Sequence, residues 1–337
     1  MLVIRLSAMG DVAMAVPVVA ALRSAHPDLR ITVLTRPFFK PFFRDIEGIE
    51  FFEPDLQGRH KGLGGLIRLF GDLRGLGIDC VADLHDVLRS KVLRTLFALT
   101  GHETARIDKG RAEKEAMTRK FRKKVVPLKT TFERYRDVFL ELGCYLDLPP
   151  RMPRRERPIP EQMTALAGAK TGKWVGIAPF AKHKGKIYPT VKTDELIGLL
   201  SARYEKVFVF GGGVYEQQFG EFMQTRYPNI VSVIGHVTLD EELDLMANMD
   251  CMIGMDSATM HLCSLVGTPV VSIWGATHPY AGFYGYGQDP ANAVQLDLPC
   301  RPCSVYGNKP CIFKDYRCLE GIAPQTIADR VAVVVGA

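Results

Sequence analysis

The stretch IGMDSATMHLCSLVGTPVVSIWGATHP, residues 253–279, decides how the rest of the chain is interpreted. A short apolar run ends in glycine, and Asp256 and Ser257 follow where the N-cap of a helix is expected. Residues 258–266 have helical character, the next glycine can end the helix, and a Thr-Pro pair leads into the apolar run VVSIWG. The pattern predicts one strand–helix–strand unit of a parallel sheet.

The start of this predicted helix suits a phosphate group. Backbone N–H groups in the first turn of a helix have no partner within it, and the helix dipole adds partial positive charge there. His261 lies one turn after Ser257, on the same helix face. These features predict a site for a nucleotide diphosphate. Taken alone they also fit a simple helix cap and a buried core histidine.

Strands and helices alternate along the whole chain. Apolar runs predict strands at residues 2–6, 31–35, 49–53, 79–84, 174–179, 207–212 and 231–235. Helical patterns fall at residues 12–25, 66–76, 86–99, 191–203, 214–226, 239–248 and 324–335. Such alternation is typical of parallel sheets covered by helices on both faces.

A proline-rich segment divides the two series. Residues 147–160, DLPPRMPRRERPIP, have no hydrophobic period and are interpreted as a linker. We therefore predict an N-terminal Rossmann-like domain at residues 1–155 and a second at 156–322. The helix in residues 323–337 is expected to pack back on the N-terminal domain. Two such domains would face each other across a cleft at the carboxyl ends of their strands.

The composition indicates a soluble globular protein. Hydrophobic residues make up 47% of the 337 residues and charged residues 24%. The chain starts with an apolar strand and not with a basic segment and cleavage site, and no apolar run reaches the ~20 residues of a membrane span. The expected location is the cytoplasm. A net charge of +6 is too mild to predict nucleic-acid binding.

The positive charge is unevenly distributed. Residues 106–136 are crowded with Lys and Arg, and RMPRRERP follows at residue 151. One interpretation is a solvated helical face followed by a linker. The other is a surface for an anionic acceptor or for acidic lipid headgroups.

Half of the eight cysteines form one late group, which consists of Cys300, Cys303, Cys311 and Cys318. In a cytosolic chain this spacing is compatible with a structural zinc ion, with free thiols or with local disulfides. The spacing is looser than a pair of C-x-x-C motifs. No catalytic metal site is predicted.

Further candidate site residues follow other strands. Lys186 lies in the basic loop PFAKHKGKIYP, where a cation could neutralise a diphosphate. Gly212 belongs to a glycine turn after VFVF, and the nearby Glu216 could accept hydrogen bonds from ribose hydroxyls. Asp11 lies in the first strand–helix turn, where it could act as a general base or as an N-cap. The turn lacks the G-x-G-x-x-G pattern of dinucleotide sites.

Together these segments resemble glycosyltransferase family 9, the bacterial lipopolysaccharide heptosyltransferases. The matching segments are RLSAMGDVAMAVPVVAALR, the loop ending in KIYP, the turn GGG-x-x-E, MDSATMHLCSLVGTPVVSIWGATHP and YGYGQ. The late cysteine group is also similar to that of many members. The resemblance implies a GT-B fold and a transfer that inverts the anomeric centre without a catalytic metal or other cofactor.

The resemblance also implies roles for the candidate residues. Asp11 would be the base for the acceptor hydroxyl, and Lys186 would balance the leaving diphosphate. The remaining candidates would bind the donor, and they are Gly212, Glu216, Asp256, Ser257, Ala258 and His261. The expected donor is a nucleotide sugar, namely ADP-heptose. The expected acceptor is a lipopolysaccharide core or related anionic glycolipid, with peripheral contact to the inner face of the cytoplasmic membrane.

One position departs from the family pattern. The family usually has glycine after the Asp-Ser/Thr pair, whereas this chain has Ala258, whose Cβ adds bulk where the backbone should approach the donor. The donor sugar therefore remains open at this point. Two other functions remain as alternatives: a nucleotide-sugar epimerase of similar architecture, and a non-enzymatic module that binds a polyanion.

Overall fold

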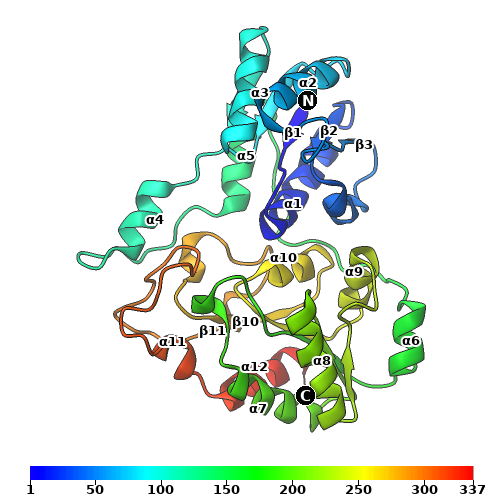
Figure 1. Ribbon diagram of the computed structural model, residues 1–337, viewed down its shortest axis with the longest axis vertical. Helices are drawn as coiled ribbons and strands as arrows, with labels where there is room; N and C mark the ends of the chain where they lie inside the picture. Colours follow the sequence, from blue (N-terminus) through cyan, green and yellow to red (C-terminus); the bar gives the residue numbers. More distant parts are fainter. Residues whose placement is uncertain (337) are drawn as a thin grey trace. The chain divides into compact units, whose positions relative to one another are not determined.

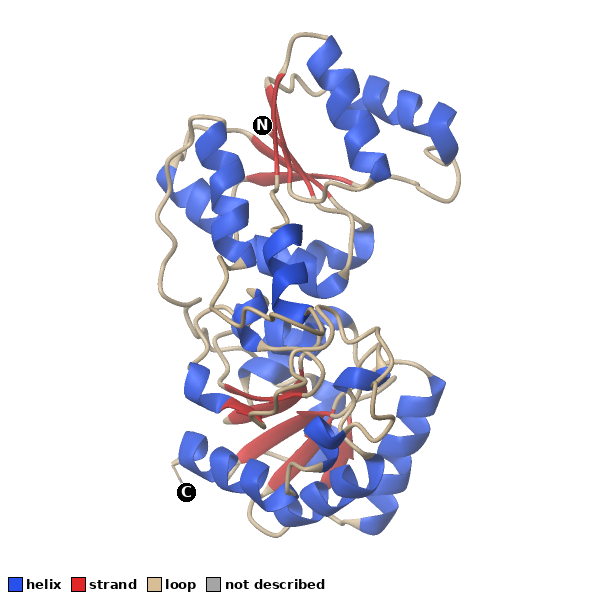
Figure 2. Cartoon of the chain, turned by 90° about the vertical axis from the view of Figure 1, so that its left-hand side faces the viewer, coloured by secondary structure: helices blue, strands red, loops and turns tan. Residues whose placement is uncertain are grey.

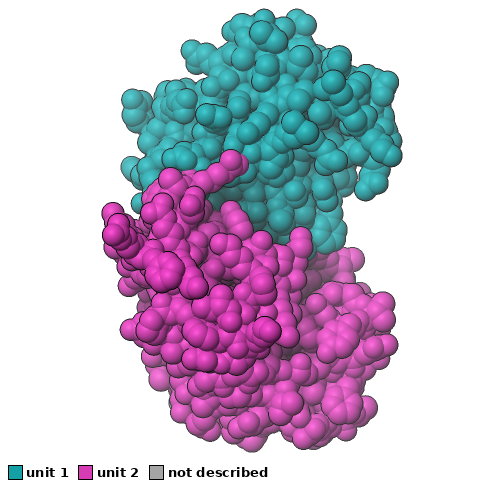
Figure 3. All heavy atoms as spheres, turned by 60° about the vertical axis from the view of Figure 1, so that its left-hand side comes forward, with its two compact units in different colours: residues 1–109, 129–150 teal, residues 110–128, 151–337 magenta. Residues whose placement is uncertain are grey.

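The computed structural model describes residues 1–336, which form two compact units (Figure 3). Unit 1 comprises residues 1–109 and 129–150. Unit 2 comprises residues 110–128 and the chain from Arg151 onward. Each unit contains one parallel sheet with helices packed beside it (Figures 1 and 2). Within residues 1–336 no helix is long and apolar enough to cross a membrane.

Unit 1 is built on a five-stranded sheet in the order β3-β2-β1-β4-β5. Its strands are β1 (Leu2–Ile4), β2 (Ile31–Leu34), β3 (Ile49–Phe52), β4 (Cys80–Asp83) and β5 (Glu103–Arg106). Its helices are α1 (Met9–Ala25), the 3-10 helix η1 (Pro37–Phe43), α2 (Gly62–Arg74), α3 (Leu88–Leu99) and α5 (Thr131–Glu141). Buried aliphatic side chains of β1, α2 and α3 form a core on this sheet.

Unit 2 is built on a six-stranded sheet in the order β11-β10-β9-β6-β7-β8. Its strands are β6 (Trp174–Ala178), β7 (Lys206–Val209), β8 (Ile230–Ser232), β9 (Cys251–Met255), β10 (Val270–Trp274) and β11 (Ala293–Gln295). Its α-helices are α4 (Arg111–Thr118), α6 (Glu161–Ala167), α7 (Thr190–Ser201), α8 (Val214–Arg226), α9 (Leu239–Ala247), α10 (Ala258–Leu265), α11 (Arg317–Glu320) and α12 (Pro324–Val335). Short 3-10 helices are η2 (Lys184–Lys186), η3 (Pro279–Ala281) and η4 (Pro290–Asn292).

The stretch that guided the sequence interpretation forms the predicted unit. β9 and β10 are parallel neighbours, and α10 connects them. Gly267 adopts a left-handed φ of +71° just after the helix, a conformation that favours glycine. Strand and helix periodicity thus predicted this segment correctly.

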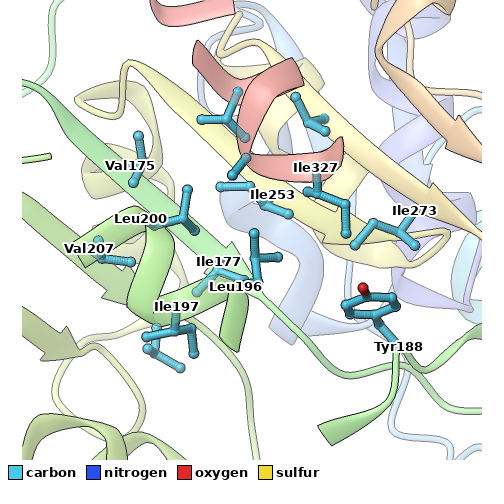
Figure 4. Close-up of a cluster of buried hydrophobic side chains, with 14 of the residues drawn as sticks. Val175, Ile177, Tyr188, Leu196, Ile197, Leu200, Val207, Ile253, Ile273 and Ile327 are labelled. Carbon is cyan, nitrogen blue, oxygen red and sulfur yellow. The ribbon is translucent and has the colours of Figure 1, made fainter. Parts of the chain in front are cut away.

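The C-terminal helix packs in the core of unit 2, whereas the sequence analysis expected it to pack back on the N-terminal domain. α12 lies in unit 2, where Ile327, Ala328 and Val331 are buried in the same core as Leu196 and Ile253 (Figure 4). Its apolar face is therefore already covered by α7 and the sheet of its own unit.

The domain boundary also differs from the expected division at residue 155. The second unit begins at Arg151 and also includes residues 110–128, which the sequence analysis assigned to the first domain. The physical reason is a set of contacts within unit 2. Lys114 is buried against the Phe283 ring, and Lys123 donates hydrogen bonds to the carbonyl groups of Cys300 and Pro302.

Helix α1 begins three residues earlier than the predicted start at residue 12. Asp11 lies in its first turn, where a carboxylate oxygen accepts a hydrogen bond from the Ala8 N–H at 3.3 Å. This contact stabilises the start of the helix before Asp11, so Asp11 is not the N-cap residue. Pro17 consequently lies in the helix interior rather than near its start.

Candidate active site

Asp11 is held by a buried arginine. Its Oδ2 lies 2.7 Å from a terminal nitrogen of Arg5, and the Asp11 side chain is 34% exposed whereas that of Arg5 is 7% exposed. Because one carboxylate oxygen is fixed by this ion pair, the direction of the carboxylate is fixed as well. The result is a partly exposed carboxylate in the first turn after β1, with a defined orientation.

Arg5 is itself fixed by two neighbouring segments. Its second terminal nitrogen donates to the Leu84 carbonyl at 2.6 Å, and its guanidinium lies 5.8 Å from the Tyr135 ring centroid. The Tyr135 hydroxyl donates to the Asp11 carbonyl at 3.2 Å, and burial raises the pKa of this tyrosine. β4 and α5 therefore both support the Asp11–Arg5 pair.

A second polar group lies at the end of β4. The Asp83 carboxylate is fully buried, and it accepts hydrogen bonds from the backbone N–H groups of His85 (2.9 Å) and Asp86 (2.8 Å) and from Arg94 (3.1 Å). The buried His85 ring has no hydrogen-bond partner at Nδ1 among residues 1–336. Burial, and then the positive charge of Arg5, lower the pKa of His85 to about 3. Unit 1 thus holds an uncharged imidazole close to the Asp11–Arg5 pair.

We expect His85 to make the protein less stable in acid. The unfolded state takes up a proton at the ordinary histidine pKa of about 6.5, whereas the folded state does so only near pH 3. The contribution of neutral His85 to the unfolding free energy is therefore fully present above pH 6.5, and it is lost as the pH falls toward 3. Between about pH 8 and about pH 5, His85 should account for a loss of about 2 kcal/mol in unfolding free energy.

Urea unfolding at several pH values tests this expectation. In the variant His85→Gln the unfolding free energy should depend less on pH than in the parent protein. The variant His236→Gln, which changes an exposed histidine, should keep the pH dependence of the parent. If the unfolding free energy fell equally steeply with pH in the parent and in His85→Gln, His85 would not be the source of the acid sensitivity.

In unit 2 the structure brings Lys186 and Asp256 together. Nζ of Lys186 lies 2.8 Å from Oδ2 of Asp256, and their side chains are only 16% and 6% exposed. The sheet register explains the pairing, since Ala178 at the end of β6 pairs with Gly254 in β9. The loops that follow these two strands therefore emerge side by side.

Two glycines allow close packing around Lys186. Gly185 accepts a hydrogen bond from the Ala276 N–H at 2.9 Å, and a Cβ at Gly185 would lie only 2.9 Å from that of Ala276. Gly307 has a left-handed φ of +75°, and a Cβ there would lie 2.6 Å from Cγ of Lys186. Close backbone approach therefore fixes the position of this lysine.

The start of α10 lacks the side-chain cap that the sequence predicted. Ser257 is the N-cap residue, but its hydroxyl makes no cap hydrogen bond and is buried without a hydrogen-bond partner. Asp256 pairs with Lys186 instead of capping the helix. Because no capping side chain accepts a hydrogen bond from the N–H groups of the first turn, these groups are suited to bind an anion. Ala258 is the first residue of this turn, and the buried His261 follows one turn later.

Gly212 and Glu216 form a second local pair. The Gly212 N–H donates to Oε2 of Glu216 at 2.7 Å, and Glu216 lies in the first turn of α8. This pair follows β7, a parallel neighbour of β6, so it lies at the same edge of the sheet as Lys186. No hydrogen bond or ion pair among residues 1–336 joins it to Lys186 or Asp256.

The family model for "Glycosyltransferase family 9 (heptosyltransferase)" matches residues 66–315. The chain belongs to glycosyltransferase family 9. It is therefore a glycosyltransferase, as the sequence resemblance predicted. The matched region includes Lys186, Glu216, Asp256 and the whole of α10, whereas Asp11 and Arg5 precede it.

Individual relatives agree with this assignment. Lipopolysaccharide heptosyltransferase 3 of Escherichia coli is 27% identical over 290 residues, which cover 80% of this chain and 81% of that protein. The structure of E. coli ADP-heptose lipopolysaccharide heptosyltransferase II superposes with a TM-score of 0.73 at 18% identity, covering 99% of this chain and 98% of that one. The structure of E. coli heptosyltransferase WaaC with ADP-2-deoxy-2-fluoro heptose superposes with a TM-score of 0.68 at 16% identity, covering 98% of each chain. The GT-B fold class is thereby confirmed.

The late cysteines of this family 9 member are not seen arranged as the zinc site that their spacing allowed. Within residues 1–336 no group of three or more His, Cys, Asp or Glu side chains is arranged to hold a metal ion. A zinc site needs four donor atoms at about 2.0–2.3 Å from one point. Cys300, Cys303, Cys311 and Cys318 are instead free thiols, and burial raises the pKa of Cys303 and of Cys318, the latter to about 11.

Sequence reasoning missed the residues that support Asp11 in this glycosyltransferase. Arg5 is the single charged residue in the predicted strand LVIRL, and a charge inside a buried strand was the available signal. Asp83 and His85 stand in the run DLHD directly after another strand, where site residues are expected. Tyr135 gave no local signal, because its contact with Asp11 joins residues 124 positions apart.

Proposed function

We propose that this glycosyltransferase transfers heptose from ADP-heptose to a lipopolysaccharide core or a related anionic glycolipid, with inversion at the anomeric carbon. The observation that carries the proposal is the Lys186–Asp256 pair beside the uncapped start of α10. A buried cation and free backbone N–H groups suit the diphosphate of a nucleotide sugar. Family membership and the relatives' names, which specify heptose and ADP, support the choice of donor.

In the proposed reaction, Asp11 accepts the proton of the acceptor hydroxyl. The acceptor oxygen then forms a bond to the anomeric carbon while the bond from that carbon to the diphosphate oxygen breaks. Lys186 and the first-turn N–H groups of α10 balance the negative charge that the departing ADP gains. Asp256 positions Lys186, and Arg5 positions Asp11. The step requires no catalytic metal or other cofactor.

The remaining residues are proposed to bind the donor. Ser257 offers an unpartnered hydroxyl at the start of α10, and Ala258 and His261 follow it in the helix. Glu216, positioned by the Gly212 N–H, is proposed to accept hydrogen bonds from the ribose hydroxyls. The acceptor is assigned to the N-terminal unit and the nucleotide sugar to the C-terminal unit.

A thermal-shift panel of ADP, UDP, GDP and NAD tests the donor. ADP should stabilise the protein, by about 2.7 kcal/mol at a concentration 100 times its Kd. The other nucleotides should give smaller shifts, because the proposed donor carries ADP, as the relatives' names indicate. Stabilisation by UDP alone would contradict the proposal.

Product analysis tests the reaction class. Incubation with ADP-heptose and acceptor should yield a glycosylated acceptor and ADP, and incubation without acceptor should leave the nucleotide sugar unchanged. Conversion of the nucleotide sugar without acceptor would instead indicate an epimerase.

A further inference from the structure

A basic segment of the chain leaves unit 1 and packs entirely within unit 2. We name residues 110–128 the basic arm; it consists of α4 and the loop that follows (Figures 1 and 3). Two of its cations serve as anchors. The Lys114 ammonium lies 4.1 Å from the Phe283 ring centroid, and Lys123 donates to the carbonyl groups of Cys300 (2.8 Å) and Pro302 (2.9 Å).

Backbone contacts close the loop between these anchors. The Lys124 N–H donates to the Ala116 carbonyl at 3.1 Å, and the Leu128 N–H donates to the Tyr280 carbonyl at 2.9 Å. Arg122 adopts a left-handed φ of 52°, so the chain reverses at this position. These contacts fix the conformation of the loop. We name residues 119–126 the tip of the arm.

The tip combines exposed cations with exposed apolar side chains. Its exposed cations are Arg119, Lys120, Arg122 and Lys124, and its fifth cation is the anchor Lys123. Phe121 is 75% exposed and Val126 53%, and Val125 is also exposed. The two acidic residues of the arm, Glu113 and Glu115, lie on α4, so the tip has none.

This combination distinguishes the tip from a merely solvated basic loop. Single exposed apolar residues are ordinary, but an aromatic and two valines among five cations within eight residues are the composition of a membrane-interface segment. Lys and Arg near an anionic leaflet are attracted to it, and apolar side chains enter the boundary between headgroups and acyl chains. A soluble anion would use the cations but leave Phe121 and the valines in water.

We propose that residues 119–126 dock this enzyme on an anionic membrane surface. Arg119, Lys120, Arg122 and Lys124 bind the headgroups, and Phe121, Val125 and Val126 insert at the interface. The loop is joined to unit 2 through Lys114 and Lys123, so docking holds that unit at the membrane. This role is separate from the transfer chemistry and does not depend on which sugar the enzyme moves.

Sedimentation with vesicles tests the proposal on the full chain. The parent should bind vesicles of phosphatidylcholine with phosphatidylglycerol, bind phosphatidylcholine alone weakly, and detach as salt is added. Arg119→Glu/Lys120→Glu should weaken binding by about tenfold or more. Its control, Arg151→Glu/Arg155→Glu, makes the same change of charge at exposed linker positions and should bind as the parent does.

The apolar contribution needs its own pair of variants. Phe121→Ser/Val126→Ser should weaken binding to the anionic vesicles although every charge is retained. Phe222→Ser/Val333→Ser removes two comparably exposed apolar side chains from α8 and α12 of the same unit and should leave binding unchanged. Equal unfolding midpoints by urea confirm that each variant is folded.

Three outcomes would overturn the proposal. One is unchanged vesicle binding by both tip variants. Another is binding of the tip to single-stranded RNA but not to vesicles, which would assign it to a nucleic acid. The third is that the tip variants lose transfer to a water-soluble acceptor, which would assign the tip to the acceptor site. Because vesicle binding is read without turnover, a failure of the proposed transfer reaction would be seen separately.

Discussion

Asp11→Asn is expected to lower kcat by about 10²–10⁴-fold, because the variant cannot accept the proton of the acceptor hydroxyl. Asparagine has nearly the same shape, and its side-chain oxygen can still accept hydrogen bonds from Arg5 and from the Ala8 N–H. The loss should therefore fall on kcat, and the KM for the donor should change little. Steady-state kinetics with both substrates varied measures this.

The same substitution weakens a partly buried ion pair. Since Asp11 is 34% exposed and Asn still accepts a hydrogen bond, the loss of stability should be about 1–2 kcal/mol, below the 3–5 kcal/mol of a fully buried pair. Urea unfolding verifies that the variant is folded under assay conditions. Asp28→Asn, an exposed carboxylate of the same unit, serves as the matched control and should keep parental turnover. Near-normal kcat in Asp11→Asn would remove Asp11 from the proposed mechanism.

Lys186→Met should damage both activity and stability. Loss of the cation that is proposed to balance the leaving diphosphate should lower kcat by about 10²–10³-fold. Asp256, only 6% exposed, would keep a buried charge without its partner, and that should cost about 3–5 kcal/mol of unfolding free energy. Lys182→Met, at an exposed position of the same loop, is the matched control and should change neither quantity strongly.

A double variant separates the two effects of Lys186. In Lys186→Met/Asp256→Asn the buried charge is gone, so most of the lost stability should return while kcat stays low. Recovery of activity together with stability would show that Lys186 acts only by stabilising the fold. Failure of the double variant to regain stability would contradict the pairing of these two residues.

Most of the architecture could be predicted from local patterns. Runs of apolar residues at the spacing of buried strands alternate with amphipathic helices, and this periodicity depends only on neighbouring residues. The predicted strands at residues 2–6 and 174–179, for example, correspond to β1 and β6. The polar edge strand β5 was missed, because ETAR lacks an apolar run that would mark it.

The sequence named individual candidate residues, but it did not predict several of their partners. Lys186 and Asp256 were each predicted as separate ligand contacts, and the structure joins them in one buried ion pair. Ser257 was expected to cap α10, yet its hydroxyl makes no cap contact. The partners depend on which loops meet at the sheet edge, and no local pattern contains that information.

The sequence by itself determined the parallel α/β class, the strand–helix–strand unit at residues 253–279 and the membership in glycosyltransferase family 9. Only the tertiary structure decided that Arg5 holds Asp11, that Lys186 pairs with Asp256, and that the basic arm packs in unit 2. The physical reason is the range of the interactions. Periodicity and turn chemistry act over a few residues, whereas the Lys186–Asp256 pair depends on the register of β6 against β9, strands more than 70 residues apart.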